Sequence, residues 1–398
     1  MSEWIQYKLG EVATDFAMGP FGSNIKAENF IDTGVPVIRG TNLNFDRYVD
    51  GSFVYLSEEK ADDLKKSNCF PGDLVFTHRG TIGQVGLIPE GQYSRYVISQ
   101  SGMKLSADNE KINNYFLFYF FKSNIGQYEL LKNESQVGVP AISSPLRSLK
   151  DVDILLPPLK EQKAIAEVLS SLDDKIDLLH RQNKTLEALA QTLFRQWFVE
   201  EAKNEWDEVT VGDFVKTNAS TLKKDSLLET IQYLDTSSLT EGKIDTFQQL
   251  DLVDAPSRAK RIVKHNDVLI STVRPNQKHY GIIKNPSEDI IVSTGYCVVS
   301  CEKINPHFIY ILLTTDDMTE YLHSIAEGST STYPSLKPAD IEAVEFLLPP
   351  DDKLQDFSDY ADDAWEKIDN NHIQIKTLEN MRDTLLPKLM SGEVRIKI

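Results

Sequence analysis

The sequence has few cysteines, no long apolar run and no leader-like start. Three cysteines in 398 residues, Cys69, Cys297 and Cys301, are too few and odd in number for a disulfide framework. No apolar run approaches the roughly 18 residues of a membrane span. The first residues lack a basic region followed by an apolar one, so we expect no signal peptide. These absences favour a reducing cytoplasm.

The motifs of common catalytic and cofactor sites are also absent. Residues 80–86 are glycine-rich but have neither dinucleotide-binding nor P-loop spacing, so a turn between strands is favoured over a phosphate cradle. Cys297 and Cys301 share one face of an expected strand without metal-ligand spacing, which favours core thiols. The seven histidines form no His-x-x-x-His pair. We therefore predict no catalytic centre and no metal site in this chain.

Charge is segregated along the chain. The net charge of −18 argues against nucleic acid if it is spread evenly, because phosphate binding depends on Lys and Arg. However, residues 351–370 hold eight acids and two lysines, whereas residues 258–284 hold seven basic residues and one acid. The chain can therefore present a basic surface to DNA while its acidic part faces protein partners.

The chain contains an internal repeat with an offset of 192 residues. Four short segments recur with identical letters and without a gap: 156–158, 175–177, 184–187 and 192–193 become 348–350, 367–369, 376–379 and 384–385. Such self-similarity indicates duplicated structural units. We predict four parts in the order domain, helix, domain, helix, at residues 1–157, 158–200, 201–349 and 350–398, the last part including a C-terminal tail.

Both repeated segments predict a long amphipathic helix of about 40 residues, or about 60 Å. Each follows a Pro-Pro pair, which ends the preceding strand. Apolar residues then recur at alternating three- and four-residue spacing, which is typical of a coiled-coil seam. The expected seam residues are Ile165, Leu169, Leu172, Ile176, Leu179, Leu186, Leu193, Ile368, Ile375, Leu378 and Leu385.

Neither helix could bury its apolar stripe alone, so we expect the two to form an antiparallel coiled coil. Asn183 and Asn371 interrupt the two stripes at positions that could face each other in this pairing. A buried asparagine pair would fix the register, although surface exposure of both is equally compatible with the sequence.

The predicted fold class is α/β (α+β), with two globular mixed α/β domains that contain twisted, mainly antiparallel sheets. One helix is expected in each domain, near residues 113–132 and 306–326. Strands are expected in the first copy at residues 35–39, 73–77, 96–105 and 152–156. The second copy has strand-like runs at 231–234, 267–273, 290–300 and 344–348.

The remaining polar segments contain residue types that can bind DNA. Arg, Lys, Asn and Gln can bind phosphates or pair with base edges, and they gather in a few loops of each copy. The alternative is that these are ordinary polar loops. In the first copy we predict DNA contacts at Asn24, Lys26, Arg39, Thr41, Asn42, His78, Arg79 and Thr81. In the second copy the candidates are Arg258, Lys260, Arg261, Lys264, Arg274, Asn276, Lys278 and His279.

The whole pattern resembles the specificity subunits of type I restriction–modification systems. Two variable domains alternate with two repeated helices, each introduced by Leu-Pro-Pro. Residues 72–80 (GDLVFTHRG), 267–275 (DVLISTVRP) and 390–394 (MSGEV) are also similar to motifs of that family. The resemblance covers essentially the whole chain.

The resemblance implies two target-recognition domains, each reading one half of a split, asymmetric site in double-stranded DNA. It further implies that the helices set the gap and dock two copies of an adenine methyltransferase subunit, which a restriction and translocation subunit joins for cleavage. S-adenosylmethionine, ATP and Mg would then belong to the partners, and this chain would hold no cofactor. The alternative is an adaptor that bridges proteins without touching DNA, which would not need the basic residues 258–284.

Overall fold

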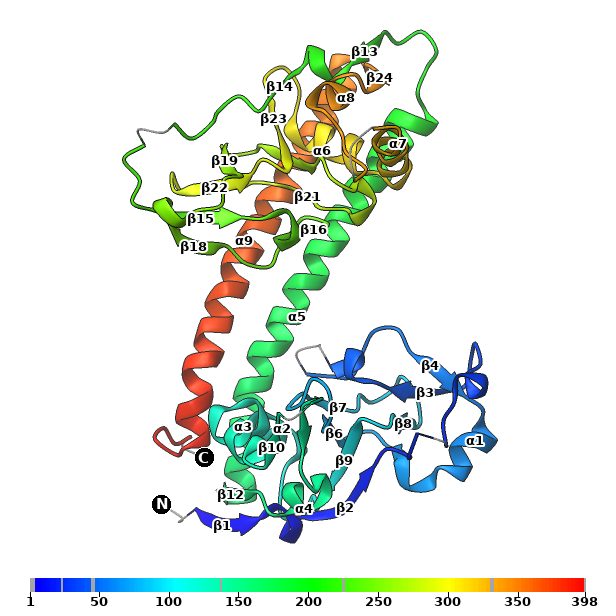
Figure 1. Cartoon of the computed structure of the whole chain (residues 1–398), viewed down its shortest axis with the longest axis vertical. Helices are drawn as coiled ribbons and strands as arrows, with labels where there is room; N and C mark the ends of the chain where they lie inside the picture. Colours follow the sequence, from blue (N-terminus) through cyan, green and yellow to red (C-terminus); the bar gives the residue numbers. More distant parts are fainter. Residues whose placement is uncertain are drawn as a thin grey trace. The chain divides into compact units, whose positions relative to one another are not determined.

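The computed structural model describes residues 4–22, 24–43, 47–136, 138–223, 226–329 and 333–396. The chain divides into two compact units: unit 1 combines Met1–Leu179 with Gln374–Ile398, and unit 2 is His180–Ile373. Each unit contains one globular α/β part and a segment of both long helices, α5 (Leu159–Arg195) and α9 (Asp351–Met390) (Figure 1). None of the described helices is long and apolar enough to cross a membrane. The domain limits predicted at the ends of the helices remain a prediction.

The globular part of unit 1 is built on two four-stranded sheets. The first sheet is antiparallel and has the order β2 (Ala13–Met18), β9 (Gly102–Ala107), β6 (Leu74–Thr77), β7 (Val85–Leu87). The second sheet, in which β3 and β8 run parallel, has the order β4 (Val54–Leu56), β3 (Val35–Ile38), β8 (Tyr96–Ile98), β5 (Asn68–Cys69). Two short pairs are β1 (Ile5–Lys8) with β12 (Asp153–Leu156) and β10 (Glu134–Ser135) with β11 (Ala141–Ile142). The short helices are α1 (Glu58–Asp63), α2 (Asn114–Lys122), α3 (Asn124–Leu131) and α4 (Pro145–Lys150).

Unit 2 repeats the topology of both four-stranded sheets. Its first sheet has the order β14 (Val215–Thr217), β23 (Tyr296–Cys301), β20 (Val268–Ser271), β21 (Tyr280–Ile282). Its second sheet has the order β18 (Gln248–Asp251), β15 (Thr230–Leu234), β22 (Ile290–Ser293), β19 (Ala259–Ile262), again with one parallel pair, β15 and β22. The short pairs are β13 (Glu208–Thr210) with β24 (Glu345–Leu347) and β16 (Leu239–Thr240) with β17 (Lys243–Ile244). The short helices are α6 (Pro306–Thr314), α7 (Asp316–Glu327) and α8 (Pro338–Glu342).

The central strand of each first sheet explains why these runs are apolar throughout. Successive side chains of a strand point to opposite faces. In β6, Leu74 and Phe76 enter the core beneath α2, while Val75 enters a second core shared with the other sheet. In β20, Val268 and Leu269 divide between two cores in the same way. Because both faces are covered, these strands lack the alternation of a half-exposed strand.

Two of the predicted strands are wrong in extent. Residues 96–105 form β8 and β9, which lie in different sheets, and residues 290–300 form β22 and β23 in the same relation. A tight turn separates each pair: Gly102 N donates to Ser99 O at 2.9 Å, and Gly295 N donates to Ser293 Oγ at 3.1 Å. The apolar residues on both sides of each turn made one long strand the simpler expectation.

The single helix predicted in each domain is two helices. Ser123 separates α2 from α3 and caps α3, since its side chain accepts a hydrogen bond from Gly126 N. Thr315 separates α6 from α7 and accepts from Met318 N in the same way. Ser and Thr favour such N-cap positions because their oxygens satisfy an otherwise unpaired amide of the first turn. The remaining strand and helix positions agree with the prediction to within a few residues.

The two long helices pack antiparallel, as predicted, and this is visible within each unit. In unit 1, Arg395 Nη2 lies 2.6 Å from Glu161 Oε2 and Arg382 Nη1 lies 3.1 Å from Asp173 Oδ1, so partner numbers fall as α5 advances. The segments are joined by a small cluster of Ile176, Leu179, Ile375 and Leu378. The other predicted seam residues are buried at Ile165, Leu169 and Ile368 and partly buried at Leu172, Leu186, Leu193 and Leu385.

In unit 2, Asn183 and Asn371 form a buried pair, which is one of the two arrangements that the sequence left open. Asn371 Nδ2 donates to Asn183 Oδ1 at 2.7 Å, and the two residues are 0% and 6% exposed. The pair leaves Asn183 Nδ2 and Asn371 Oδ1 buried with no hydrogen-bond partner among the described residues. The pairing therefore specifies which residues face each other at some cost in stability.

The long helices also pack against the globular parts of the chain. These contacts were not predicted from the sequence. In unit 2, Phe194 of α5 and Phe357 of α9 contact Phe308 of α6, with ring centroids 5.0 and 6.1 Å away. Trp365 of α9 is stacked on His307 at 4.6 Å. Helix and domain therefore share one hydrophobic core in this unit.

His307 fixes the start of α6 to α9. Its Nδ1 lies 2.9 Å from Asp362 Oδ1, and its Nε2 lies 2.7 Å from Lys284 Nζ. A neutral imidazole fits both neighbours, with Nδ1 donating to the carboxylate and Nε2 accepting from the ammonium. Burial, reinforced by the charge of Lys284, lowers the pKa of His307 to about 4.

The asparagine pair predicts unequal effects of single and double substitution. Asn371→Leu should lower the free energy of unfolding by about 1–3 kcal/mol, because it leaves the buried Asn183 amide unpaired. Asn183→Leu combined with Asn371→Leu should recover or exceed wild-type stability, because no buried amide remains. Denaturant unfolding followed by circular dichroism measures both. A double variant less stable than the single one would contradict this assignment.

His307 predicts a pH-dependent loss of stability. Its pKa in the folded state lies below the value of roughly 6.5 expected when unfolded, so the unfolded chain binds the extra proton more readily. The stabilisation is complete above pH 6.5 and is lost as pH falls toward 4, by roughly 3 kcal/mol in total. His307→Gln should flatten the stability profile across this window. An unchanged slope in the variant would show that other groups cause the acid sensitivity.

Candidate nucleic-acid interface

In both units, predicted contact residues lie on one loop of the first sheet. In unit 1 it joins β6 to β7 and contains His78, Arg79 and Thr81; in unit 2 it joins β20 to β21 and runs from residue 272 to 279. As expected, the glycine-rich segment forms an inter-strand turn, with residues 80–84 in the loop and residues 85–86 at the start of β7. Loops that a rigid sheet holds in place are common locations for binding residues.

A later segment of the chain supports each of these loops. In unit 1, Gly80 N donates to Pro140 O at 2.9 Å, and Ile142 N donates to His78 O at 2.9 Å. In unit 2, Arg274 N donates to Pro334 O at 3.0 Å, and Leu336 N donates to Thr272 O at 2.7 Å. The two loops therefore have the same backbone support although their sequences differ.

The turn between the two sheets of unit 1 brings further candidates to this loop. His78 N donates to Ser101 O, and Ser99 N donates to Ile38 O, the residue before Arg39, both at 2.9 Å. A Cβ atom on Gly22 would lie 2.9 Å from Gln100 Oε1, so the turn that leads to Asn24 also lies here. Three separate segments of sequence therefore meet at residues 99–101.

Unit 2 also brings candidate segments together at its own inter-sheet turn. Thr272 N donates to Gly295 O at 2.8 Å, and Thr294 N donates to Arg258 O at 2.7 Å. The turn thus joins the β20–β21 loop to the cationic strand β19 and its flanks. Sequence reasoning missed both turns, because they lie inside the runs that were expected to be continuous strands.

The cations of unit 2 are held in defined positions. Arg274 and Lys278 both adopt left-handed backbone conformations, with φ of 49° and 55°, which is unusual for residues with side chains. Arg274 lies over the Tyr333 ring, 4.9 Å from its centroid. Lys278 Nζ lies 2.8 Å from Asp316 Oδ1 and 3.3 Å from Glu241 Oε1, and the hydrogen bond to Asp316 is the main cause of its raised pKa.

The other candidates of unit 2 lie around the edge strand β19 or beside the β20–β21 loop. Arg258 is paired with the Asp235 carboxylate, and Arg261 Nη1 donates to Thr221 Oγ1 at 3.3 Å. Lys260, Lys264 and Asn276 have exposed side chains, whereas His279 is partly buried and its Nδ1 lies 2.7 Å from Leu239 O. The exposed members can approach a ligand without rearrangement.

Two candidates of unit 1 have structural roles instead. Asn42 is 1% exposed; its Oδ1 accepts from Arg39 N, and its Nδ2 donates to Asp50 O and Ser52 O, at 3.0–3.1 Å. His78 is also buried, and its Nε2 lies 3.2 Å from Gln100 O. Both side chains are occupied in shaping the loops and would have to give up these bonds to contact a base. The exposed candidates of unit 1 are Asn24, Lys26, Arg39, Thr41, Arg79 and Thr81.

The described residues contain no group of three or more His, Cys, Asp or Glu side chains arranged to hold a metal ion. The cysteines fit the predicted core role, since Cys69 and Cys297 are buried and Cys301 is partly buried. Burial raises the pKa of the Cys297 thiol to about 12, which keeps it protonated and unreactive.

The fold and its surfaces define a class of protein: a duplicated chain in which each unit joins a polar, partly cationic loop surface to a segment of paired helices. Residues 1–188 match the family model of the type I restriction modification DNA specificity domain. The chain is similar to the specificity subunits of type I restriction–modification systems.

Similar proteins extend this match along the chain. The specificity subunit of the type I restriction enzyme MjaIX from Methanocaldococcus jannaschii is 27% identical and covers 98% of this chain and 92% of its own. The specificity subunit of HindI from Haemophilus influenzae is 22% identical over 99% of this chain and 100% of its own. The crystal structure of a type I restriction-modification S subunit from M. genitalium has the same fold, with a TM-score of 0.61 at 17% identity over 97% of this chain and 96% of that one.

The structural role of Asn42 can be tested directly. Asn42→Ala should lower the free energy of unfolding by about 1–3 kcal/mol, because it leaves three backbone groups of the loop without their partner. Thr41→Ala, in an exposed neighbour, should change it by less than about 0.5 kcal/mol. If Asn42→Ala unfolds like the wild type but loses DNA binding, Asn42 contacts DNA after all.

Proposed function

We propose that each unit reads one half of a bipartite, asymmetric DNA site. The observation that carries this proposal is the convergence of separate polar and cationic segments on the inter-sheet turn of each unit. The two copies retain the same backbone arrangement but place different side chains on it, such as Arg79 in one and Arg274 and Lys278 in the other. A shared framework with different side chains suits two unlike half-sites, because base edges are distinguished by their hydrogen-bonding groups.

In this proposal the long helices set the gap between the half-sites and dock the methyltransferase subunits. The acids of residues 351–370 support a protein-facing role for α9, since phosphates would repel them. The partners would be two copies of an adenine methyltransferase and, for cleavage, a restriction subunit. The chain itself would be non-catalytic and cytoplasmic, with S-adenosylmethionine, ATP and Mg bound by those partners.

Methylation mapping tests this function most simply. The chain is co-expressed with its adenine methyltransferase partner, and methylated adenines are mapped across the host genome. We expect one motif with two unlike halves and a fixed gap. Methylation without sequence preference, or a contiguous motif, would contradict the proposal.

The cationic loop of unit 2 gives a local prediction. Arg274→Ala combined with Lys278→Ala should reduce methylation about tenfold or more while leaving the partner complex intact, because each lost phosphate or base contact costs about 1–3 kcal/mol. Lys216→Ala is the matched control, since Lys216 is also an ion-paired cation of unit 2 but lies on β14. Normal methylation by the double variant would show that the second reading surface lies elsewhere.

A further inference from the structure

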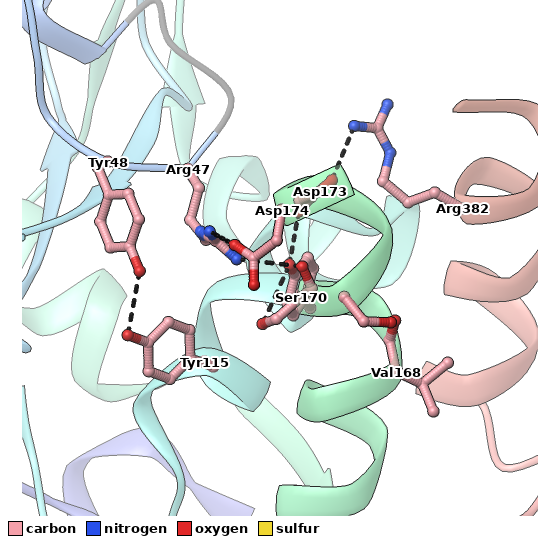
Figure 2. A network of polar contacts seen from close by, with 10 residues as sticks. Arg47, Tyr48, Tyr115, Val168, Ser170, Asp173, Asp174 and Arg382 are labelled. Atoms are coloured by element: carbon pink, nitrogen blue, oxygen red, sulfur yellow. Dashed lines mark hydrogen bonds and ion pairs between the residues drawn. The ribbon is translucent and has the colours of Figure 1, made fainter. Parts of the chain in front are cut away.

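A network of polar contacts joins the globular part of unit 1 to the long helices (Figure 2). Arg47 follows the loop that begins at Arg39, and its side chain is 5% exposed. Its guanidinium pairs with the Asp174 carboxylate on α5, and Nη1 donates to Ser170 O at 3.5 Å. Arg47 also lies over the Tyr48 ring, 4.7 Å from the centroid.

The network continues from α5 to α2 and α9. Tyr119 of α2 donates its hydroxyl proton to Asp173 Oδ2 at 2.5 Å, and Arg382 of α9 donates from Nη1 to Asp173 Oδ1 at 3.1 Å. The hydroxyls of Tyr48 and Tyr115, the latter on α2, lie 3.1 Å apart. Within unit 1 the domain therefore contacts both long helices through charged and phenolic groups.

Arg47 lies at one end of a loop whose other end carries candidate DNA contacts. Asn42 holds Arg39 through its backbone amide, while Leu87 N donates to Arg47 O at 2.9 Å. Asn42 also bonds to Asp50 and Ser52, so the turn that carries Arg39 and Thr41 is tied to the residues that follow Arg47. The Arg47 side chain adds the contact from this segment to α5.

Unit 2 attaches its domain by different chemistry. At the 192-residue offset, Ser170, Asp173 and Asp174 correspond to Asp362, Trp365 and Glu366 on α9. There the attachment is the neutral His307, which bonds to Asp362 and stacks on Trp365.

The loop of unit 2 that follows β15 also lacks a counterpart of Arg47. Residues 235–247 contain a single cation, Lys243, and its ammonium lies 3.7 Å from the Asp245 carboxylate of the same loop. Among the described residues, an ion pair between this type of loop and a long helix is therefore found in unit 1 and not in unit 2.

We propose that Arg47 is a positioning residue for the first recognition unit. Its ion pair with Asp174 on α5 orients the loop that carries Arg39 and Thr41. Reading by unit 1 then depends on a charge pair between loop and helix, whereas reading by unit 2 does not. This inference rests on the proposed function, since it assigns the loop to one half-site. Asp174 is 63% exposed, so water can partly replace its carboxylate and the effect of losing it is moderate.

The test uses the complex of the full chain with its methyltransferase partner. Asp174→Asn removes the charge without changing the shape of the side chain, and Asp174→Glu retains the charge. Methylation rates are measured on duplexes with single base changes in one or the other half-site. The first half-site is identified as the one whose reading the Arg274/Lys278 double variant leaves intact.

We expect Asp174→Asn to reduce discrimination at the first half-site about two- to fivefold, with the second half-site unchanged. Asp174→Glu should stay close to wild type. Glu366→Gln is the matched control, because Glu366 occupies the equivalent position on α9, and it should change neither half. Thermal unfolding of each variant separates altered reading from a general loss of stability.

An equal loss at both half-sites, or no loss at either, would overturn the role of Arg47. A general loss of methylation that tracks a lower Tm would do the same, because it would reduce the contact to a structural one. Failure of the proposed function would be recognised separately, since the wild-type complex would then show no two-part site.

Discussion

The antiparallel packing of α5 on α9 is the interaction on which the rest of each unit depends. Their apolar stripes cannot be buried by either helix alone, and in each unit they are covered by the partner helix and by the globular part together. The buried Asn183–Asn371 hydrogen bond then makes one register preferable to its neighbours. Since the domains share cores with these helices, the position of each candidate DNA-binding loop follows from helix packing within its unit.

Electrostatics are local in this chain. The net charge of −18 includes carboxylates that lie beside candidate DNA contacts, as in the pairs Arg258–Asp235 and Lys278–Asp316. Such pairs hold side chains in fixed directions and weaken their attraction for phosphate. DNA affinity would then depend more on partner subunits than it does for a strongly basic reader.

Sequence reasoning found what depends on periodicity and repetition: the two helices, their antiparallel pairing and the central strands of the four-stranded sheets. It missed features that depend on a single backbone turn. Ser123 and Thr315 look like ordinary helix residues until their capping bonds are seen, and the polar residues 99–101 form a turn between two apolar runs that were expected to be one strand. Among site residues, the polar character of Asn42 was evident, but its burial depends on carbonyls ten residues away. The role of Arg47 depends on Asp174, 127 residues along the chain.

The most direct test of the central claim, that two separate units each read their own half-site on a common helical framework, is to exchange one of them. Residues 201–349 are replaced by the corresponding segment of a related specificity subunit, and the adenines methylated by the chimaeric complex are mapped. The account predicts a motif in which one half is new while the other half and the gap are unchanged. Alteration of both halves would contradict it.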